Sequence, residues 1–256
     1  TPVNQKAGTV DIEYTVEEKP NDQLELSAGY GGFQGLIGTL GVSFNNFSIH
    51  NIRKKEAWHP LPQGDGQKLS LRAQTNGRFF QSYNASFTEP WFGGKKPTSF
   101  TVGGFYTRYS NIDAQYRSIG YYSIASGTMG LGTRLKWPDD NFLVNATLNF
   151  QQNKLKDYPG LFTVANGTFN NLNLRLTLAR TTVADPIFPR DGSKISLTGQ
   201  FTPPYSLFNG KSAADYADLP LEKRFHWLEY HKWRLDLEFY KSIIGKLVLK
   251  VSNKTG

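Results

Sequence analysis

Two histidines and two glutamates stand close together near the end of the sequence: Glu222, His226, Glu229 and His231. Side chains of these types bind zinc. However, a five-residue spacing between histidines, in a stretch that passes from a loop into a strand, is not the ligand pattern of a zinc site. A solvated loop explains these residues more simply. The sequence therefore predicts no metal site.

Residues that could act as a general acid, base or nucleophile also lack the required surroundings. Asp139, Asp140 and Asp185 stand beside prolines, in segments where Asp favours turns. No Gly-x-Ser-x-Gly nucleophile motif is present. The stretch "GGFQG" (31–35) lacks the Lys-Ser/Thr of a phosphate-binding loop. We expect no enzymatic activity, no catalytic residues and no cofactor.

The formal net charge of +8 raises the possibility of nucleic-acid binding. The basic residues are scattered along the sequence, and the compact cluster is Arg53-Lys54-Lys55 in "RKKEAW" (53–58). A scattered charge of this kind does not form a nucleic-acid footprint. We expect a solvated basic turn at this cluster. Contact with anionic groups at a membrane surface, or with a partner subunit, is the alternative.

The elements that must position any site are strands. In "NLNLRLTLAR" (171–180), Leu172, Leu174, Leu176 and Leu178 take every second place, which predicts a strand with one apolar and one polar face. Most such stretches approach the roughly 9–11 residues that cross a bilayer at a tilt, and no apolar run reaches the ~20 residues of a membrane helix. The pattern predicts eleven strands, at 23–31, 36–47, 68–75, 82–89, 99–109, 118–136, 142–150, 171–180, 193–201, 233–240 and 246–252.

The apolar faces could meet either a second protein layer or lipid. A β-sandwich would bury them under a second sheet. Against this, the other face of these strands is consistently polar, and the hydrophobic fraction is only 38% while aromatic residues reach 14%. Aromatic residues also gather at the compact turns, where they would form the interfacial belt of a transmembrane β-barrel. We expect lipid-facing leucines and a belt of Trp91, Phe92, Trp137 and Phe188.

The connections between the predicted strands alternate in character. Compact turns are expected at 90–97, 137–141 and 187–193, and long polar loops at 151–169 and 204–226. Outer-membrane barrels have short turns on the periplasmic side and longer loops outside. The two kinds of connection should therefore lie at opposite rims.

The two ends of the chain do not fit a complete barrel. "GTVDIEYTVEEKP" (8–20) also alternates, but its second face is acidic, so residues 1–21 are interpreted as the end of a soluble domain that precedes a barrel segment at 22–256. Thr1 opens on polar sequence without a signal peptide. Closed single-chain bacterial barrels have even strand numbers. We therefore expect a partial barrel from a longer protein.

Three segments, in this order, resemble the BamA family, the central subunits of the β-barrel assembly machinery. They are "GTVDIEYTVEEKPNDQLELSAGYGG" (8–32), "QSYNASFTEPWFGG" (81–94) and "DPIFPRDGSKISLTGQF" (185–201). The resemblance implies a sixteen-strand barrel of which this chain holds the first ten or eleven strands. It also implies that residues 1–21 end the last periplasmic POTRA domain. The stretch 48–67 departs from the family, which often has a short turn there.

The resemblance implies an outer-membrane protein that folds and inserts β-barrel proteins. Its client strands would add to a weak seam edge at the first barrel strand. Its partners would be outer-membrane lipid, client β-barrel proteins and the lipoprotein subunits of the machinery, with no nucleic acid. A Gly-rich hairpin, without any role in a seam, is the simpler interpretation of Gly29 and Gly31. For the whole protein, a two-partner-secretion-type transporter is the alternative function. The expected edge comprises Gln23, Leu24, Glu25, Leu26, Ser27, Ala28, Gly29, Tyr30 and Gly31.

Overall fold

The computed structural model describes residues 3–4, 9–10, 22–31, 35–58, 60–94, 96–115, 117–160, 164–210, 213–217, 219–220, 224 and 226–256. Its main feature is one eleven-stranded sheet, in which every strand from β3 to β13 is antiparallel to its sequence neighbours. The predicted antiparallel meander is confirmed. The strands are β3 (Gln23–Tyr30), β4 (Leu36–Phe47), β5 (Gln67–Thr75), β6 (Phe80–Glu89), β7 (Thr98–Ile112), β8 (Ser118–Arg134), β9 (Phe142–Lys156), β10 (Gly167–Thr181), β11 (Gly192–Phe201), β12 (His231–Ile244) and β13 (Leu247–Thr255).

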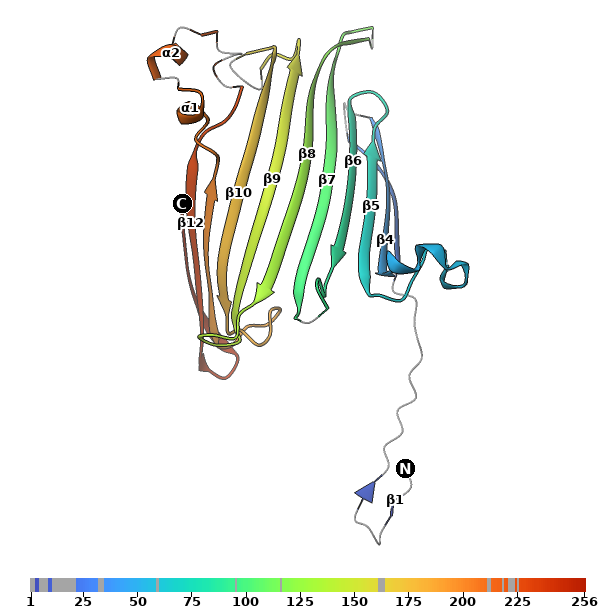
Figure 1. Cartoon of the computed structure of the whole chain (residues 1–256), viewed down its shortest axis with the longest axis vertical. Coiled ribbons are helices and arrows are strands. Elements are labelled where there is room, and N and C mark those ends of the chain that lie inside the picture. Colours follow the sequence, from blue (N-terminus) through green and yellow to red (C-terminus); the bar gives the residue numbers. More distant parts are fainter. Residues whose placement is uncertain are drawn as a thin grey trace.

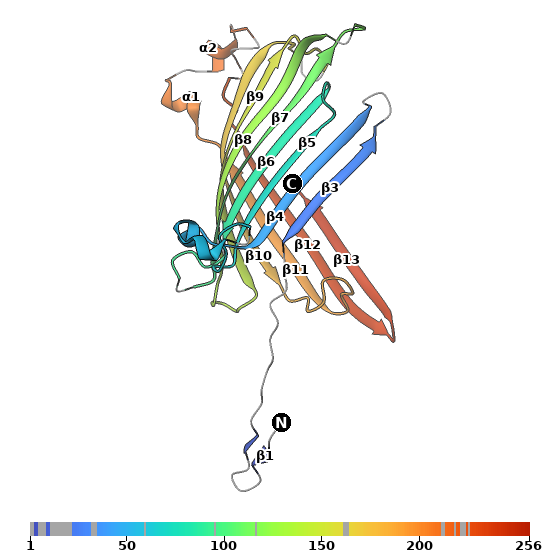
Figure 2. The ribbon, with the colours of Figure 1, turned by 90° about the vertical axis from the view of Figure 1, so that its right-hand side faces the viewer.

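The sheet curves into an open, tilted half-barrel with β3 and β13 at its two free edges (Figure 1, Figure 2). The remaining described elements are short. They are the pair β1 (Val3–Asn4) and β2 (Thr9–Val10), the 3-10 helices η2 (His50–Arg53) and η3 (Lys55–Ala57), and the helices α1 (Tyr205–Phe208) and α2 (Ala213–Ala217). Within the described residues, none of the helices has the length and apolar character needed to cross a membrane.

The two faces of the sheet differ as the alternation predicts. On β10, Leu174, Leu176 and Leu178 are exposed on the convex face, with Leu174 41% exposed, while Leu172 is half-buried. Asn173 points to the other face and is only 1% exposed. Side chains on the concave side of a curved sheet crowd together, which explains why polar residues are the more buried ones here. No second sheet covers the described leucines.

The five connections named from the sequence lie at opposite rims as predicted, but the long connection at 48–66 lies at the same rim as the compact turns. Strand direction alternates along the meander, so the compact turns follow β6, β8, β10 and β12 at the rim where β3 begins, the lower rim of Figure 1. Trp91 and Trp137 therefore lie at the same rim. The described residues of the loops at 157–166 and 202–230 lie at the upper rim. Most of residues 1–21, including the predicted end of the soluble domain, lies outside the described residues.

The predicted loop at 151–169 is wrong in its length. β9 continues to Lys156 and β10 starts at Gly167, so only 157–166 connects them. The alternation fails because apolar residues change sides at the upper rim. There, Tyr122, Leu155 and Phe169 form a buried cluster on the concave face. Ile124, Tyr158 and Val164 pack against this cluster, which is the apolar core of the described chain.

Candidate functional site

The predicted seam edge lies at one end of the sheet. β3 pairs with β4 in a continuous register from Gln23 opposite Ser43 to Tyr30 opposite Leu36. Its other side has no strand partner among the described residues. Alternate backbone N–H and C=O groups of an edge strand point away from its single neighbour. β3 therefore presents a row of groups that can pair with another strand.

The side chains of β3 are as open as its backbone. All eight residues are exposed, and Leu26 is 80% exposed. Leu24 and Tyr30 share its face and are similarly uncovered. These three side chains continue the apolar convex surface of the sheet up to β3, its first strand. The edge is thus apolar on its convex side.

One ion pair ties β3 to the strand beyond its neighbour. Arg72 on β5 donates from Nη2 to Glu25 Oε1 at 2.8 Å, across Gly41 of β4. A Cβ at Gly41 would lie 3.1 Å from Glu25 Oε2 and 3.7 Å from Arg72 Cγ, so the glycine leaves the path between them open. Both charged side chains are about half exposed. Such a pair is worth about 0.2–1 kcal/mol, so it secures β3 only weakly.

The glycines of the edge have separate roles. Gly31 N–H donates to the carbonyl of Gly35 at 2.9 Å, and Gly35 has a φ of 74°, so both belong to the hairpin turn. Gly29 lies within the strand, and a Cβ placed there would have no described atom within 4 Å. Neither turn geometry nor close packing requires a glycine at 29. A loosened edge remains our prediction for that position.

The predicted aromatic belt occupies the lower rim. Trp91, Phe92, Trp137 and Phe188 are all exposed there, with Trp137 82% exposed. Phe92 packs against Phe100 with ring centroids 5.0 Å apart, which holds one belt residue against the convex face. Exposed aromatic residues at one rim fit a membrane–water interface. Their contact with lipid stays a prediction.

Two of the acidic residues considered for catalysis, Asp139 and Asp185, accept hydrogen bonds within turns. Asp139 accepts hydrogen bonds from Arg180 Nη2 at 2.7 Å and from Asn141 N–H at 2.8 Å. The Arg180 guanidinium holds the pKa of the Asp139 carboxyl below its ordinary value. The backbone N–H groups of Phe188 and Ile187 lower the pKa of Asp185 in the same way. These pairings leave both carboxylates ionised and occupied.

The histidine and glutamate candidates are also engaged in structural contacts. His226 Nδ1 lies 3.1 Å from the carbonyl oxygen of Thr168, and Glu229 accepts two hydrogen bonds from Ser206. Glu222 lies outside the described residues. Within the described part of the chain, no three His, Asp or Glu side chains gather as metal ligands do.

Sequence reasoning missed Arg72 and Gly41 as supports of the edge. Both are ordinary members of alternating stretches, and their relation to Glu25 depends on the registers of β3 with β4 and of β4 with β5. A glycine facing the polar side of a predicted strand was the available signal.

Comparison with known proteins identifies the fold. A model of the Omp85 superfamily domain matches residues 63–255, which begins after β3 and β4. No curated protein sequence matches the chain. The chain is similar to the crystal structure of BamA from Haemophilus ducreyi lacking POTRA domains 1–3, with a TM-score of 0.53 and 18% sequence identity. That similarity covers 88% of this chain and 38% of the BamA chain, so the chain spans well under half of that protein.

The superfamily match covers most of the chain, and the structural similarity agrees with the curved antiparallel sheet described above. Its polar concave face, apolar convex face and aromatic rim are those of a transmembrane barrel. The chain therefore belongs to the Omp85 superfamily, and its sheet is part of a β-barrel of the bacterial outer membrane.

Proposed function

We propose that the whole protein folds and inserts β-barrel proteins into the outer membrane, and that client strands pair with the free edge of β3. The supporting observation is that β3 combines an unpaired backbone edge with eight exposed side chains, at the end of a continuous sheet. The action is non-enzymatic, because its driving force is strand pairing.

The physical basis is backbone hydrogen bonding in a medium without water. An unsatisfied N–H or C=O group in hydrocarbon costs several kcal/mol, so an open edge is a strong template for another strand. β3 is held to the sheet by eight paired residues and one exposed ion pair. In this proposal, the strand that closes the whole barrel pairs only weakly with β3, so a client strand can compete for that side.

The remaining assignments complete this proposal. The lower rim faces the periplasm, with its aromatic belt at the lipid interface. Residues 1–21 end the last POTRA domain, and residues 22–256 form the first part of the barrel. Client β-barrel proteins, membrane lipid and lipoprotein subunits of an assembly machinery are the partners.

Disulfide trapping of a stalled client tests the proposal. Ser27→Cys places a thiol on the concave side of β3, and the natural chain has no cysteine, so any crosslink is unambiguous. Ser70→Cys is the matched control, because Ser70 faces the same side but lies on β5 between two partner strands. With one cysteine placed in the last strand of the client, we expect oxidation to crosslink it to the Ser27→Cys variant and only rarely to the Ser70→Cys variant.

The same experiment separates the alternative function. A two-partner-secretion-type transporter would pass its substrate along the concave face, which carries Glu25, Arg72, Arg175 and Lys194. Equal crosslinking at both cysteines would favour that transporter. Absence of a Ser27 crosslink, with the client still stalled on the protein, would contradict strand addition at β3.

A further inference from the structure

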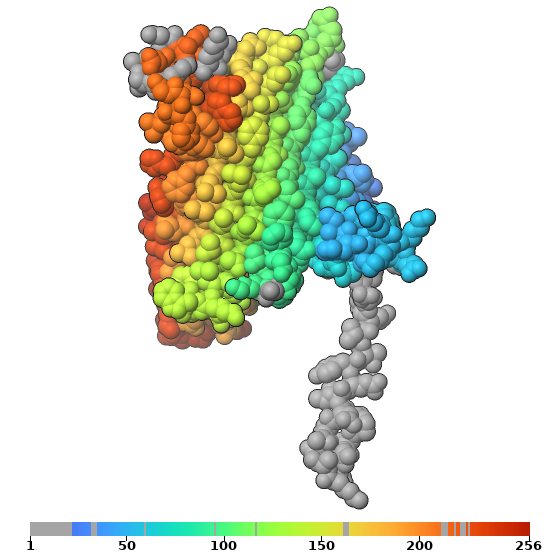
Figure 3. All heavy atoms as spheres, viewed as in Figure 1, coloured from blue at the N-terminus to red at the C-terminus, as the bar shows by residue number. Residues whose placement is uncertain are grey.

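The connection between β4 and β5 is far longer than a hairpin requires. Two residues suffice to join antiparallel strands, yet residues 48–66 separate Phe47 from Gln67. This stretch, the β4–β5 insertion, contains η2 and η3 and projects sideways from the convex face at the lower rim (Figure 1, Figure 3). Its position, beside the sheet instead of below it, is that of a segment at the membrane surface.

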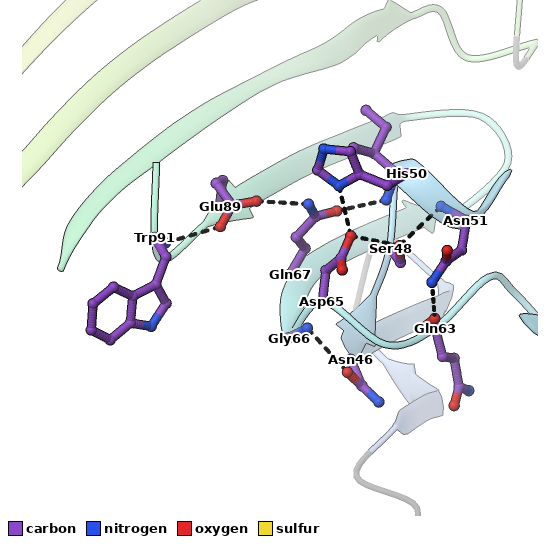
Figure 4. A network of polar contacts seen from close by, with 11 residues as sticks. Asn46, Ser48, His50, Asn51, Gln63, Asp65, Gly66, Gln67, Glu89 and Trp91 are labelled. Carbon is purple, nitrogen blue, oxygen red and sulfur yellow. Dashed lines mark hydrogen bonds and ion pairs between the residues drawn. The ribbon is translucent and has the colours of Figure 1, made fainter. Parts of the chain in front are cut away.

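A polar network around the buried hydroxyl of Ser48 fixes the base of the insertion (Figure 4). The Ser48 hydroxyl donates to Asp65 Oδ2 at 2.6 Å, and Asn51 N–H donates to the same hydroxyl at 3.0 Å. His50 Nδ1 lies 2.7 Å from Asp65 Oδ2. Ser48 is fully buried, so its partners satisfy it in the absence of water. The insertion therefore has a defined conformation.

A second part of the network connects the insertion to the aromatic belt. Gln67, which is buried, accepts a hydrogen bond from Ile49 N–H at 2.7 Å and donates to Glu89 Oε2 at 2.6 Å. The other oxygen of Glu89 accepts the N–H of Trp91 at 2.9 Å. The insertion and the belt turn at Trp91 are thus held as one unit.

The outer surface of the insertion combines apolar and basic side chains. Ile49, Ile52 and Trp58 are exposed, and the Trp58 indole donates to the Ile52 carbonyl at 3.2 Å. Arg53, Lys54 and Lys55 lie between them and are also exposed. In the part of the chain that the structure describes, none of these three cations forms a salt bridge. Exposed apolar residues beside unpaired cations are typical of segments that lie in the headgroup region of a bilayer.

A cavity separates the insertion from the belt turn. Its volume is about 620 Å³. Ile49, Phe87, Phe92 and Phe100 give it an apolar wall that continues the convex face, and His50, Asp65, Gln67 and Glu89 form its polar end. Asp65 and Glu89 are occupied by the donors described above. The cavity therefore has an apolar side, continuous with the convex face, and a polar end.

We propose that the β4–β5 insertion is an interfacial anchor that binds anionic phospholipid at the lower rim. The basic residues contact the lipid phosphate, Ile52 and Trp58 lie at headgroup depth, and an acyl chain runs along the cavity wall. Charge complementarity and continuity with the lipid-facing surface identify this occupant. Glu56 and Asp65 reduce the local positive charge, but Asp65 is engaged with Ser48 and His50. A protein subunit below the barrel would approach the rim from the periplasm, away from this lateral surface.

Lipid selectivity tests the anchor. The full-length protein is reconstituted with spin-labelled phosphatidylglycerol or phosphatidylcholine, and the association of each lipid is measured by electron paramagnetic resonance. The variant is Arg53→Gln/Lys54→Gln/Lys55→Gln. The matched control is Arg190→Gln/Lys136→Gln/Lys246→Gln, which removes the same charge from exposed residues of other turns at this rim.

We expect the insertion variant to lose at least about tenfold in association at the highest-affinity phosphatidylglycerol sites, since each of the three cations near an anionic surface contributes several-fold. The control should lose much less. The preference should also weaken at high salt, because exposed charges are screened. Equal losses in the two variants would overturn the assignment to the insertion.

The depth of Trp58 in the bilayer provides a second readout, which does not depend on whether the triple variant folds fully. Brominated lipids quench tryptophan fluorescence at the interface, and the difference between the natural protein and Trp58→Phe isolates Trp58. We expect Trp58 to be quenched in vesicles of phosphatidylethanolamine and phosphatidylglycerol. If Trp58 is unquenched, and the triple variant instead loses a lipoprotein subunit on purification, the surface binds protein and the proposal is wrong.

Discussion

β3 and the middle strands of the sheet are built from the same alternating pattern but are held very differently. β3 has eight residues, one partner strand and one half-exposed ion pair. β9 has fifteen residues, two partner strands and a buried apolar cluster at its upper end. Pairing on both sides and burial both add to stability along the sheet. Within the described residues, the middle of the sheet is therefore held on both sides, whereas β3 is held on one side only.

The largest expected effect comes from emptying the core at the upper end of β9. Leu155 is 3% exposed, and Leu155→Ala should lower the free energy of unfolding by about 2–5 kcal/mol because a cavity remains. Leu26→Ala on β3 removes the same atoms from an exposed site and should cost far less. Unfolding of the full-length barrel in urea measures both. Similar losses at the two positions would contradict the contrast between middle and edge.

A matched glycine pair sharpens the comparison. A Cβ at Gly104 on β7 would lie 2.9 Å from the Ser126 carbonyl oxygen, so Gly104→Ala forces backbone to move and should cost about 1–3 kcal/mol. Gly29→Ala on β3 meets no described atom and should stabilise by up to about 1 kcal/mol through the unfolded chain. Heat stability of the folded barrel on gels distinguishes them. Equal destabilisation by the two substitutions would show that Gly29 is closely packed in the folded barrel.

The ion pair at the edge should have a smaller effect. Glu25→Arg places two cations together across Gly41 and should loosen β3 by less than about 1 kcal/mol, as expected for an exposed pair. Hydrogen exchange of the β3 amides should accelerate, and Glu25→Arg with Arg72→Glu should restore protection. Failure of the double exchange to restore it would exclude the pair as the tie between β3 and β5.

The smallest expected effect is a pH dependence of the docking of the β4–β5 insertion at the C-terminal end of β4. Hydrogen bonds from Ser48 and His50 hold the pKa of Asp65 below its ordinary value of 3.8. A lowered pKa stabilises the folded insertion above pH 3.8, and this contribution is lost as the pH falls through the folded value. Trp58 fluorescence should report looser docking below about pH 4. In the Asp65→Asn variant, the insertion should already be loosely docked at pH 7, and the change in fluorescence near pH 4 should be absent. If that change persists in the variant, a group other than Asp65 causes it.

Much of the fold could be predicted because alternation and turn residues are local. Strand ends such as those of β4 and β13 differ from the predicted ranges by a few residues at most. The short connection at 157–166 could not be predicted in this way. Leu155 and Phe169 place their apolar side chains on the concave face, against the pattern of their own strands.

The sites were predictable only in part. The position of β3 at the edge of the described sheet follows from strand order, and the order follows from the meander. The tie between Glu25 and Arg72 and the network of Ser48, Asp65 and Glu89 join residues far apart in sequence. Only the register of the folded sheet brings them together, so no local pattern could reveal them.

The central claim is that β3 works as an open edge, and locking that edge tests it most directly. In the full-length protein, one cysteine at Ser27 and one in the facing residue of the last barrel strand allow oxidation to close the seam. The natural sequence of this chain contributes no competing thiol. A closed seam leaves no N–H and C=O groups for a client strand. We predict that oxidation blocks client insertion and that reduction restores it, whereas insertion at the normal rate by the locked protein would contradict strand addition at β3.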